Sequence, residues 1–348
     1  MLVNVSVSAL LDRARLPLSR GDAGGMSDLL RGLNQCRLEL GATAWREECT
    51  RAIQMHPVRE LLHLEPLTRR AFQKPLGLVA DAVMTDMVFT NPLPHSSRGR
   101  LEHRLYQWMM DQNLCTGIRA RRSILAQAID RTVARSPEFA DFIVNAADDT
   151  NFNPRFTSFD YRINAVPKLQ PATTRVLSVV GGHLRELNLS LAVMGNMVEQ
   201  VVALDSHAPT LGMVEQLYKQ YPVIPFECSI ASLLTDSSVN DLFDFIYVPT
   251  LLHFMPDQTA TALVRNLFAR LRPGGQLMLM NFAPTLPDIG YMECVMQWYW
   301  RYRDARALRA LTADISETQI ASYAESVDVT GNLNVLALTR SVATTQIE

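Results

Sequence analysis

The stretch VLSVVGGHLRELNLSLAVMGNMVEQVVALD, from Val176 to Asp205, decides the fold. Two apolar runs, at residues 176–180 and 201–204, are typical of buried strands, and a Gly181-Gly182 turn with a helix-like segment lies between them. This order ends on a carboxylate at the tip of the second strand, which is how α/β proteins hold a nucleoside. The stretch therefore predicts a Rossmann-like domain with a nucleoside site.

The residues that follow extend the same pattern toward the C-terminus. The apolar runs VIPFE, FDFIYV and QLMLMNF alternate with helical segments, which implies a mostly parallel sheet covered on both faces. The runs VDVT and LNVLALT flank a Gly-Asn turn, so we expect a hairpin that ends the sheet antiparallel. We therefore predict a seven-stranded α/β domain over residues 151–348.

The N-terminal part of the chain has a helical pattern instead. Apolar residues recur three and four apart in LLRGLNQCRLEL, CTRAIQMHPVRELL and LEHRLYQWMM, with breaks at prolines. A polar, irregular stretch then leads into the first strand. We expect an all-α domain over residues 1–150.

Composition limits the class of protein. The 348 residues are 48% hydrophobic and 20% charged, with a net charge of -2 that gives no reason to bind nucleic acid. No run is long and apolar enough to suggest a membrane span, and the first residues lack the pattern of a signal peptide. Five cysteines without a Cys-x-x-Cys pair argue against a metal site and a disulfide framework. We expect a cytoplasmic protein with no metal.

The cofactor follows from the glycine turn. A dinucleotide site wants G-x-G-x-x-G, whereas residues 181–186 hold only two adjacent glycines, so NAD is disfavoured. A nucleoside without phosphates needs less exposed backbone, and Asp205 can accept both hydrogens of a ribose diol. Together with the Arg272-Pro273-Gly274-Gly275 turn before a later strand, this indicates S-adenosylmethionine. The alternative is an ordinary doubly wound domain without a cofactor.

Several motifs also resemble a known family. The chain is similar to class I S-adenosylmethionine-dependent methyltransferases, and within them to the PhcB-like group that makes 3-hydroxy fatty acid methyl esters as quorum signals. The resemblance implies a sheet with a reversed final strand, a cofactor over the carboxyl ends of the first strands, and a helical N-terminal part that closes the acceptor pocket. It is carried by EPLTRRAFQKPLGLVADA (Glu65 to Ala82), VLSVVGGHLREL (Val176 to Leu187), VVALDSHAPTL, DFIYVPTLLHF, LRPGGQLMLMNF and GYMECVMQWYWRYR (Gly290 to Arg303).

The chain departs from that group at two places. The group's Lys-Pro-Arg-Gly-Tyr-Ala-Gly-Asp signature reads KPLGLVAD here, at residues 74–81, so an Arg and a Tyr have become leucines. Its Gly-Leu-Tyr-Asp-Tyr reads TLLHF here, at residues 250–254. Polar groups around the expected acceptor are thus replaced by apolar ones and a histidine, which weakens the fatty-acid ester assignment.

Methyl transfer requires that the nucleophile, the methyl carbon and the sulfur are aligned, and that at most one proton is removed from the acceptor. A carboxylate acceptor is already ionised at neutral pH, whereas a hydroxyl or amine needs a general base. His253 is the leading candidate for that base, because it follows the strand Phe243 to Val248 at the edge where open α/β sheets place their sites. The alternative is a histidine packed between its neighbours with both nitrogens satisfied.

Residues near the glycine turn form the expected cofactor site. Arg185 and Glu186, which we expect to open a helix, would hold the methionine carboxylate and ammonium, and the family carries the same Gly-His-Leu-Arg-Glu. The alternative is a pair of surface charges. Ser229 lies where methyltransferases often contact the adenine. The complete set is Gly181, Gly182, His183, Arg185, Glu186, Asp205, Ser206, Ser229 and Ile230.

An aromatic run follows the fifth strand. Met292, Met296, Tyr299 and Arg303 would share one face of a helix, which we interpret as a lid over the acceptor, with core packing as the alternative. Aromatic faces there would also stabilise a sulfonium. The candidate catalytic residues are His253, Tyr247, Tyr291, Glu293 and Asn281.

Three functions remain open. The first is a small-molecule O-methyltransferase that acts on a carboxylic or hydroxy acid in signal or secondary-metabolite biosynthesis. The second is a cyclase that closes azetidine-2-carboxylate from S-adenosylmethionine alone and releases methylthioadenosine, since azetidine-forming synthases are similar in fold. The third is a non-catalytic S-adenosylmethionine-binding protein. Under any of these readings, the protein would bind a small-molecule acid or S-adenosylmethionine alone. A homodimer is left open.

Overall fold

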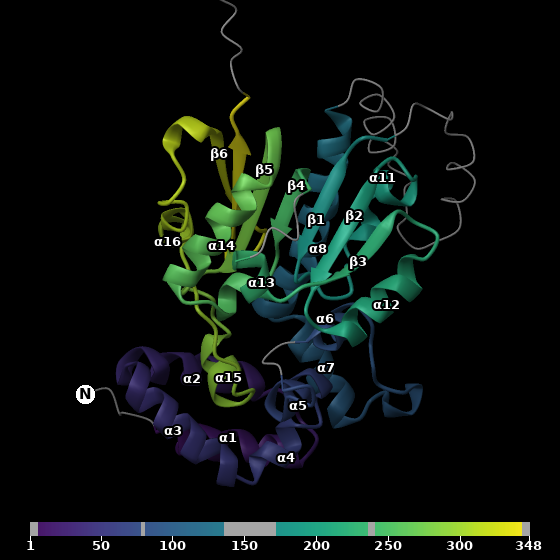
Figure 1. Cartoon of the computed structure of the whole chain (residues 1–348). Coiled ribbons are helices and arrows are strands. Elements are labelled where there is room, and N and C mark those ends of the chain that lie inside the picture. The colour runs from purple at the N-terminus through teal and green to yellow at the C-terminus, as the bar shows by residue number, and fades with distance from the viewer. Residues whose placement is uncertain (1–5, 78–80, 136–171, 236–240, 343–348) are drawn as a thin grey trace, which may run out of the picture. The chain divides into compact units, whose positions relative to one another are not determined.

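The computed structural model describes residues 6–77, 81–135, 172–235 and 241–342 (Figure 1). The chain forms two compact units. The helical unit comprises Met1–Arg119 and Pro284–Trp300, and the sheet unit comprises Ala120–Ala283 and Arg301–Glu348. These bounds differ from the expected division at residue 150 in two ways: helix α8 (Asn113–Ala134) contributes to both units, and residues 284–300 belong to the helical unit although they follow the fifth strand.

The helical unit is built from amphipathic helices, as the sequence predicts. Each buries its apolar stripe, for example Leu10 and Leu11 in the first helix and Leu29 and Leu33 in the second. Helix α5 begins at Glu65, whose carboxylate accepts from the backbone N–H groups of Leu67 at 3.0 Å and Thr68 at 2.5 Å. The elements are α1 (Val7–Ser19), α2 (Met26–Leu40), α3 (Ala42–Met55), α4 (Val58–Leu62), α5 (Pro66–Gln73), α6 (Ala82–Phe89), η1 (His95–Ser97), α7 (Leu101–Met110), the start of α8, and α15 (Ile289–Cys294).

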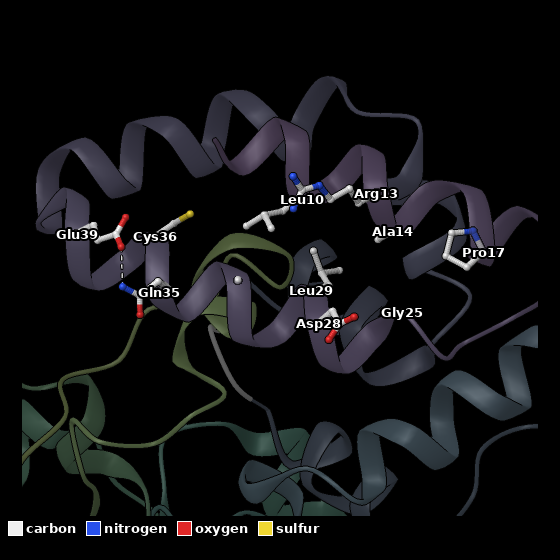
Figure 2. A pocket seen from close by; sticks show the side chains of 11 residues that line it. Leu10, Arg13, Ala14, Pro17, Gly25, Asp28, Leu29, Gln35, Cys36 and Glu39 are labelled. Carbon is white, nitrogen blue, oxygen red and sulfur yellow. Dashed lines mark hydrogen bonds between the residues drawn. The ribbon is translucent and has the colours of Figure 1, made fainter. Parts of the chain in front are cut away.

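A groove of about 580 Å³ runs between α1 and α2 (Figure 2). Its floor is apolar, formed by side chains such as Leu10 and Leu29, while Arg13, Asp28 and Glu39 line it with charges of both signs. Gly32 lines the groove, and a Cβ at this position would meet the side chain of Leu10.

The sheet unit contains a seven-stranded sheet of order β3-β2-β1-β4-β5-β7-β6. Strands β1 to β5 pair in parallel, and β7 pairs antiparallel with both β5 and β6, which confirms the predicted fold class. Helices α13 and α14 lie in front of the sheet in Figure 1, with α8 behind it. The strands are β1 (Arg175–Val179), β2 (Gln200–Asp205), β3 (Val223–Glu227), β4 (Phe243–Val248), β5 (Leu271–Phe282), β6 (Ile320–Val327) and β7 (Leu333–Arg340).

The remaining elements of the sheet unit connect these strands. Apolar side chains of β1, β2, β4 and β5 pack with α14 in one core, as expected for strands buried on both faces. The elements are η2 (Leu187–Leu189), α11 (Leu191–Met194), α12 (Ala208–Tyr218), α13 (Ile230–Thr235), η3 (Leu251–Phe254), α14 (Asp257–Ala269), α16 (Ala305–Ala310) and η4 (Glu317–Gln319).

The final hairpin has a different turn from the one expected. The sequence predicted a strand over VDVT, but β6 ends at Val327 and the next residues form the turn. The carboxylate of Asp328 accepts from the backbone N–H groups of Asn332 at 3.0 Å and Leu333 at 2.9 Å, so it organises a loop rather than a ladder.

Two further observations concern the residues that the model describes. None of their helices is long and apolar enough to cross a membrane. Their His, Cys, Asp and Glu side chains form no group of three or more that could hold a metal ion.

Candidate functional site

The turn after β1 has an unusual backbone. Val180, Gly182 and Leu184 have φ angles of 53°, 68° and 49°, so every second residue is left-handed. A β-branched residue such as valine rarely adopts this conformation. The N–H of Val180 donates to Leu204 at 2.8 Å, and its carbonyl accepts from the hydroxyl of Thr250 at 3.2 Å, which holds the strained residue in place. Strain of this kind concentrates at functional sites.

Gly181 is required by close packing. A Cβ at this position would overlap the hydroxyl of Ser178 and approach a methyl group of Leu184 at 2.5 Å. Because Ser178 and Leu184 are buried, neither side chain can move into solvent. The Gly181-Gly182 pair therefore serves one position where no side chain fits and one left-handed position.

The segment after this turn is not the regular helix that the sequence predicted. Arg185 and Glu186 lie in the turn itself, followed by the short elements η2 and α11. Alternating left-handed residues prevent a helix from starting earlier, and Ser190 begins α11 by accepting from the N–H of Val193 at 3.2 Å. Asp130 of α8 accepts from the Ser190 hydroxyl at 2.6 Å. The expected helix start at Arg185 and Glu186 is therefore wrong.

Glu186 is the centre of a buried polar group. Its side chain is 6% exposed, and the hydroxyl of Tyr247, at the carboxyl end of β4, donates to its Oε1 at 2.6 Å. Burial raises the pKa of Glu186, while the bond from Tyr247 and the charges of Arg121 and Arg122 oppose that rise. Two expected site residues thus contact each other directly.

Two arginines from α8 complete this region, and both were missed as site residues. Arg121 is 6% exposed, and its guanidinium donates to the carbonyl of Pro249 at 3.3 Å. Burial lowers its pKa to about 10, and the negative charge of Glu186 opposes that change. Arg122 donates to the carbonyl of Arg185 at 2.7 Å. Basic runs are usually solvated faces, so the sequence around Arg121 carries no signal for burial.

Asp205 lies at the tip of β2, beside the glycine turn. The register pairs Val179 with Leu204, so the ends of β1 and β2 are adjacent. The side chain of Asp205 accepts from the N–H of His207 at 3.0 Å, and burial raises its pKa. Ser206 beside it is exposed, and the charge of His183 in the turn opposes the rise in the Asp205 pKa. The tip thus brings a buried carboxylate next to Gly181 and Gly182.

Ser229 and Ile230 follow β3, one strand further along the same edge. Ser229 is exposed, and its hydroxyl accepts from the N–H of Ser232 at 3.0 Å, which caps α13. Ile230 is half-buried and packs against the core of the sheet unit. The adenine contact expected from Ser229 stays a prediction.

His253 does not have the geometry of a general base. Its Nδ1 lies 2.8 Å from the carbonyl of Thr250, and the backbone N–H of Phe282 donates to its Nε2 at 2.9 Å. These bonds fix the Nδ1-protonated tautomer and occupy the only lone pair of the ring. His253 is 1% exposed, and this burial lowers the pKa of its ring to about 3. The expectation of a base is corrected: His253 joins the ends of β4 and β5.

Asn281 at the end of β5 is fully buried. Its Oδ1 accepts from the N–H of Arg303 at 3.0 Å, while its Nδ2 has no acceptor among the described residues. An unsatisfied buried amide costs free energy in the folded protein. The polar role expected for Asn281 stays a prediction.

Tyr291 and Glu293 lie in the helical unit. The Tyr291 hydroxyl is 3.2 Å from that of Thr68. Glu293 accepts from Arg37 at 3.0 Å and from the indole of Trp45 at 2.8 Å, and burial raises its pKa. Their catalytic roles stay predictions.

The prediction of an aromatic helix after β5 is correct only for its first part. Helix α15 ends at Cys294, and Gln297 has a left-handed φ of 50°. Arg303 belongs to the sheet unit, where it is 3% exposed and binds the carbonyl of Leu252 at 2.6 Å. The helical spacing of the aromatic residues does not lead to a shared helix face.

Comparisons with known proteins agree with this architecture. No family model matches the chain, and no curated protein sequence matches it. The chain is similar to a possible exported protein from Bordetella parapertussis, with a TM-score of 0.52 and 15% identity over 97% of both chains. The strand order, with its reversed seventh strand, decides the fold class. This is a class I methyltransferase fold.

Two solved methyltransferases illustrate how distant the similar structures are. The magnesium protoporphyrin IX methyltransferase from Synechocystis PCC 6803, with bound SAH, has a TM-score of 0.43 and 12% identity over 79% of this chain and 98% of that one. The N-methyltransferase NodS from Bradyrhizobium japonicum, also with SAH, has a TM-score of 0.35 and 16% identity over 62% of this chain and 97% of that one.

Proposed function

We propose that the sheet unit binds S-adenosylmethionine and that the protein is an S-adenosylmethionine-dependent enzyme. The observation that carries the proposal is the pairing of Asp205 with the strained turn at Gly181 and Gly182, at the adjacent ends of β2 and β1. The carboxylate suits a ribose diol, and the turn lets a ligand approach the backbone closely. The carboxylate of Glu186 would bind the ammonium group of the methionine part of the cofactor.

We further propose an O-methyltransferase that acts on a carboxylic acid. Bound S-adenosylmethionine supplies a methyl carbon on a sulfonium, which a carboxylate oxygen can displace without any proton transfer. Among the groups expected to act at this edge, His253 has both nitrogens engaged, so the acceptor that needs no base fits best. Asn281, with an unsatisfied Nδ2 at the end of β5, can donate to the acid. The fatty-acid ester pathway is one candidate setting.

Cofactor binding tests the first proposal. We expect Asp205→Asn to weaken S-adenosylmethionine binding by about tenfold or more, because the amide cannot accept both ribose hydrogens. Glu199→Gln, which lies just before the other end of β2, should leave the affinity unchanged. Isothermal titration of both variants gives the answer. Equal affinities for the two variants would remove the ribose assignment.

A second function is favoured by Glu186. A cyclase must take a proton from the amine, whose lone pair then attacks the side-chain carbon while the carbon–sulfur bond breaks and its electrons pass to sulfur. Burial raises the pKa of Glu186, which makes it a better proton acceptor. The products would be azetidine-2-carboxylate and methylthioadenosine, with the proton on Glu186.

The nucleoside product separates these two functions. The protein is incubated with S-adenosylmethionine alone and then with a panel of carboxylic acids, and the nucleosides are identified by mass spectrometry. Methylthioadenosine without an acceptor would contradict the methyltransferase. S-adenosylhomocysteine that forms only with an added acid would contradict the cyclase.

A further inference from the structure

Two left-handed residues meet within the helical unit. Lys74, which ends α5, has a φ of 47°, and Gln297 after α15 has a φ of 50°. The ammonium of Lys74 donates to the carbonyl of Gln297 at 2.9 Å. This bond brings the lysine to the residue directly before Trp298, whose Cα lies about 3.8 Å from that of Gln297.

Lys74 is a half-buried cation. Burial lowers its pKa, and no neighbouring charge contributes to that change. Within the described ranges its ammonium forms no ion pair, and the carbonyl of Gln297 takes one of its three hydrogens. A cation in this position is normally matched by an anion, since desolvation of an unpaired charge is costly.

Trp298 directly follows Gln297, the residue whose carbonyl binds this lysine, and its indole is unsatisfied. Trp298 is 3% exposed, it packs edge-on against Trp300 with ring centroids 4.5 Å apart, and its Nε1 has no acceptor among the residues described. Buried indoles usually find a hydrogen-bond acceptor. The next side chain, Tyr299, carries the guanidinium of Arg46 over its ring at 4.2 Å.

The charges around this segment favour an anion. Glu293, the carboxylate that precedes it, is already bound by Arg37 and by the indole of Trp45. Lys74 and Trp298 therefore offer donors with no acidic side chain to satisfy them in the described part of the chain. The groove of Figure 2 differs, because charges of both signs line it and select no ligand class.

We propose that Lys74 and Trp298 form an anion-binding site that takes the carboxylate of a small organic acid. The inference goes beyond the proposed function, because both residues belong to the helical unit. A carboxylate would accept a charge-assisted hydrogen bond from the lysine and a second bond from the indole.

The four tryptophans of the chain allow a direct test by NMR. In a ¹⁵N-labelled full-length protein, octanoate is titrated while the indole N–H resonances are followed, each assigned by a Trp→Phe variant. We expect the Trp298 resonance to move downfield with octanoate and to stay in place with neutral octanamide. The Trp45 resonance is an internal control, because its Nε1 already donates to Glu293 at 2.8 Å.

Lysine variants complete the test. Lys74→Met should weaken octanoate binding about tenfold, since it removes the charge but keeps the length of the side chain. Lys219→Met, at an exposed lysine after α12, should leave binding unchanged. If octanoate leaves the Trp298 resonance in place, or binds folded Lys74→Met as tightly as the parent protein, the site is overturned. S-adenosylmethionine titrations are run alongside: a protein that binds octanoate at Trp298 but binds no S-adenosylmethionine contradicts the proposed function alone.

Discussion

The two units each contain a glycine at which no side chain fits, but the obstacle differs. At Gly181 in the sheet unit, an added Cβ would meet the side chains of Ser178 and Leu184. At Gly290 in the helical unit, it would meet the backbone of Leu33 and Asn34 in α2. Side chains can rotate to some extent, whereas the backbone of a helix cannot. The close approach at Gly290 is therefore fixed by helix backbone, whereas the one at Gly181 is set by two buried side chains that can change rotamer only within the core.

The largest effect is expected at Gly290. Gly290→Ala should reduce the free energy of unfolding by about 3 kcal/mol or more, because α15 must move away from α2 to make room. Urea denaturation of the full-length protein measures this. The control is Gly212→Ala inside α12, where a Cβ meets nothing within 4 Å, and this change should stabilise by up to about 1 kcal/mol. Equal stability of the two variants would contradict the comparison.

Gly181→Ala should have a smaller effect on stability and a large one on the cofactor. We expect a loss of about 2 kcal/mol, since Ser178 and Leu184 must rotate within a packed core. S-adenosylmethionine binding should fall at least tenfold, because the turn between β1 and η2 would be displaced. Urea denaturation and calorimetric titration measure the two effects. A variant that keeps full affinity would show that the turn does not contact the ligand.

Two buried groups, His253 in the sheet unit and Glu65 in the helical unit, should make contributions to stability that respond to pH in opposite directions. The pKa of His253 is about 3 in the folded protein against an ordinary 6.5, so only the unfolded chain binds this proton between those values, and the sheet unit loses stability as the pH falls below 6.5. The loss is about 2 kcal/mol by pH 5. The pKa of Glu65 is about 7 in the folded protein against an ordinary 4.5, so its contribution to the stability of the helical unit is lost as the pH rises from 4.5 to 7 and changes no further above 7.

Hydrogen exchange, followed peptide by peptide at several pH values and corrected for intrinsic rates, would resolve the two slopes. Glu65→Gln is the control, because it should remove the contribution of Glu65 to the pH dependence of the helical unit and leave that of the sheet unit unchanged. A helical unit whose pH dependence is the same with Glu65 and with Gln at this position would contradict the assignment.

The smallest effect is expected at Trp45. Trp45→Phe removes the indole N–H that binds Glu293 but leaves the bond from Arg37. The free energy of unfolding should fall by about 1 kcal/mol, as for one buried hydrogen bond to a charged group that keeps a second donor. Trp108→Phe is the matched control, because its indole reaches the Ser27 hydroxyl only at 3.4 Å and in an exposed position. Urea midpoints that fall equally for both variants would argue against a structural role of Glu293.

Local patterns predicted most of the sheet. The run FDFIYV is β4 without any change of bounds, because a buried parallel strand reads as a short apolar run between turn residues. The run VIPFE is β3, an edge strand with no buried residue, which its apolar composition did not indicate. The same logic failed after β5. The spacing from Met292 to Arg303 suggested a helix, yet nothing local shows that Gln297 is left-handed or that Arg303 returns to the sheet unit.

The site was partly predictable for a similar reason. Strand tips meet at one edge of a parallel sheet, so Asp205, Glu186 and Tyr247 could be placed near each other from their order alone. Arg121 could not, because its partner Pro249 is 128 residues away. For His253, the bond to Thr250 is three residues away, but the one from Phe282 depends on how β4 and β5 end.

The origin of the helical unit in two stretches of chain has a consequence for synthesis. Trp45 and Cys49 of α3 are buried in the complete unit, where the indole of Trp45 donates to Glu293 of α15. A ribosome that adds 5 to 20 residues per second needs roughly 10 to 50 s to travel from α3 to α15. During that interval the nascent helices keep apolar surface and thiols unburied. We expect the N-terminal helices to need chaperone protection until residues 284–300 have been synthesised. Nascent chains stalled before residue 284 should be the form that aggregates.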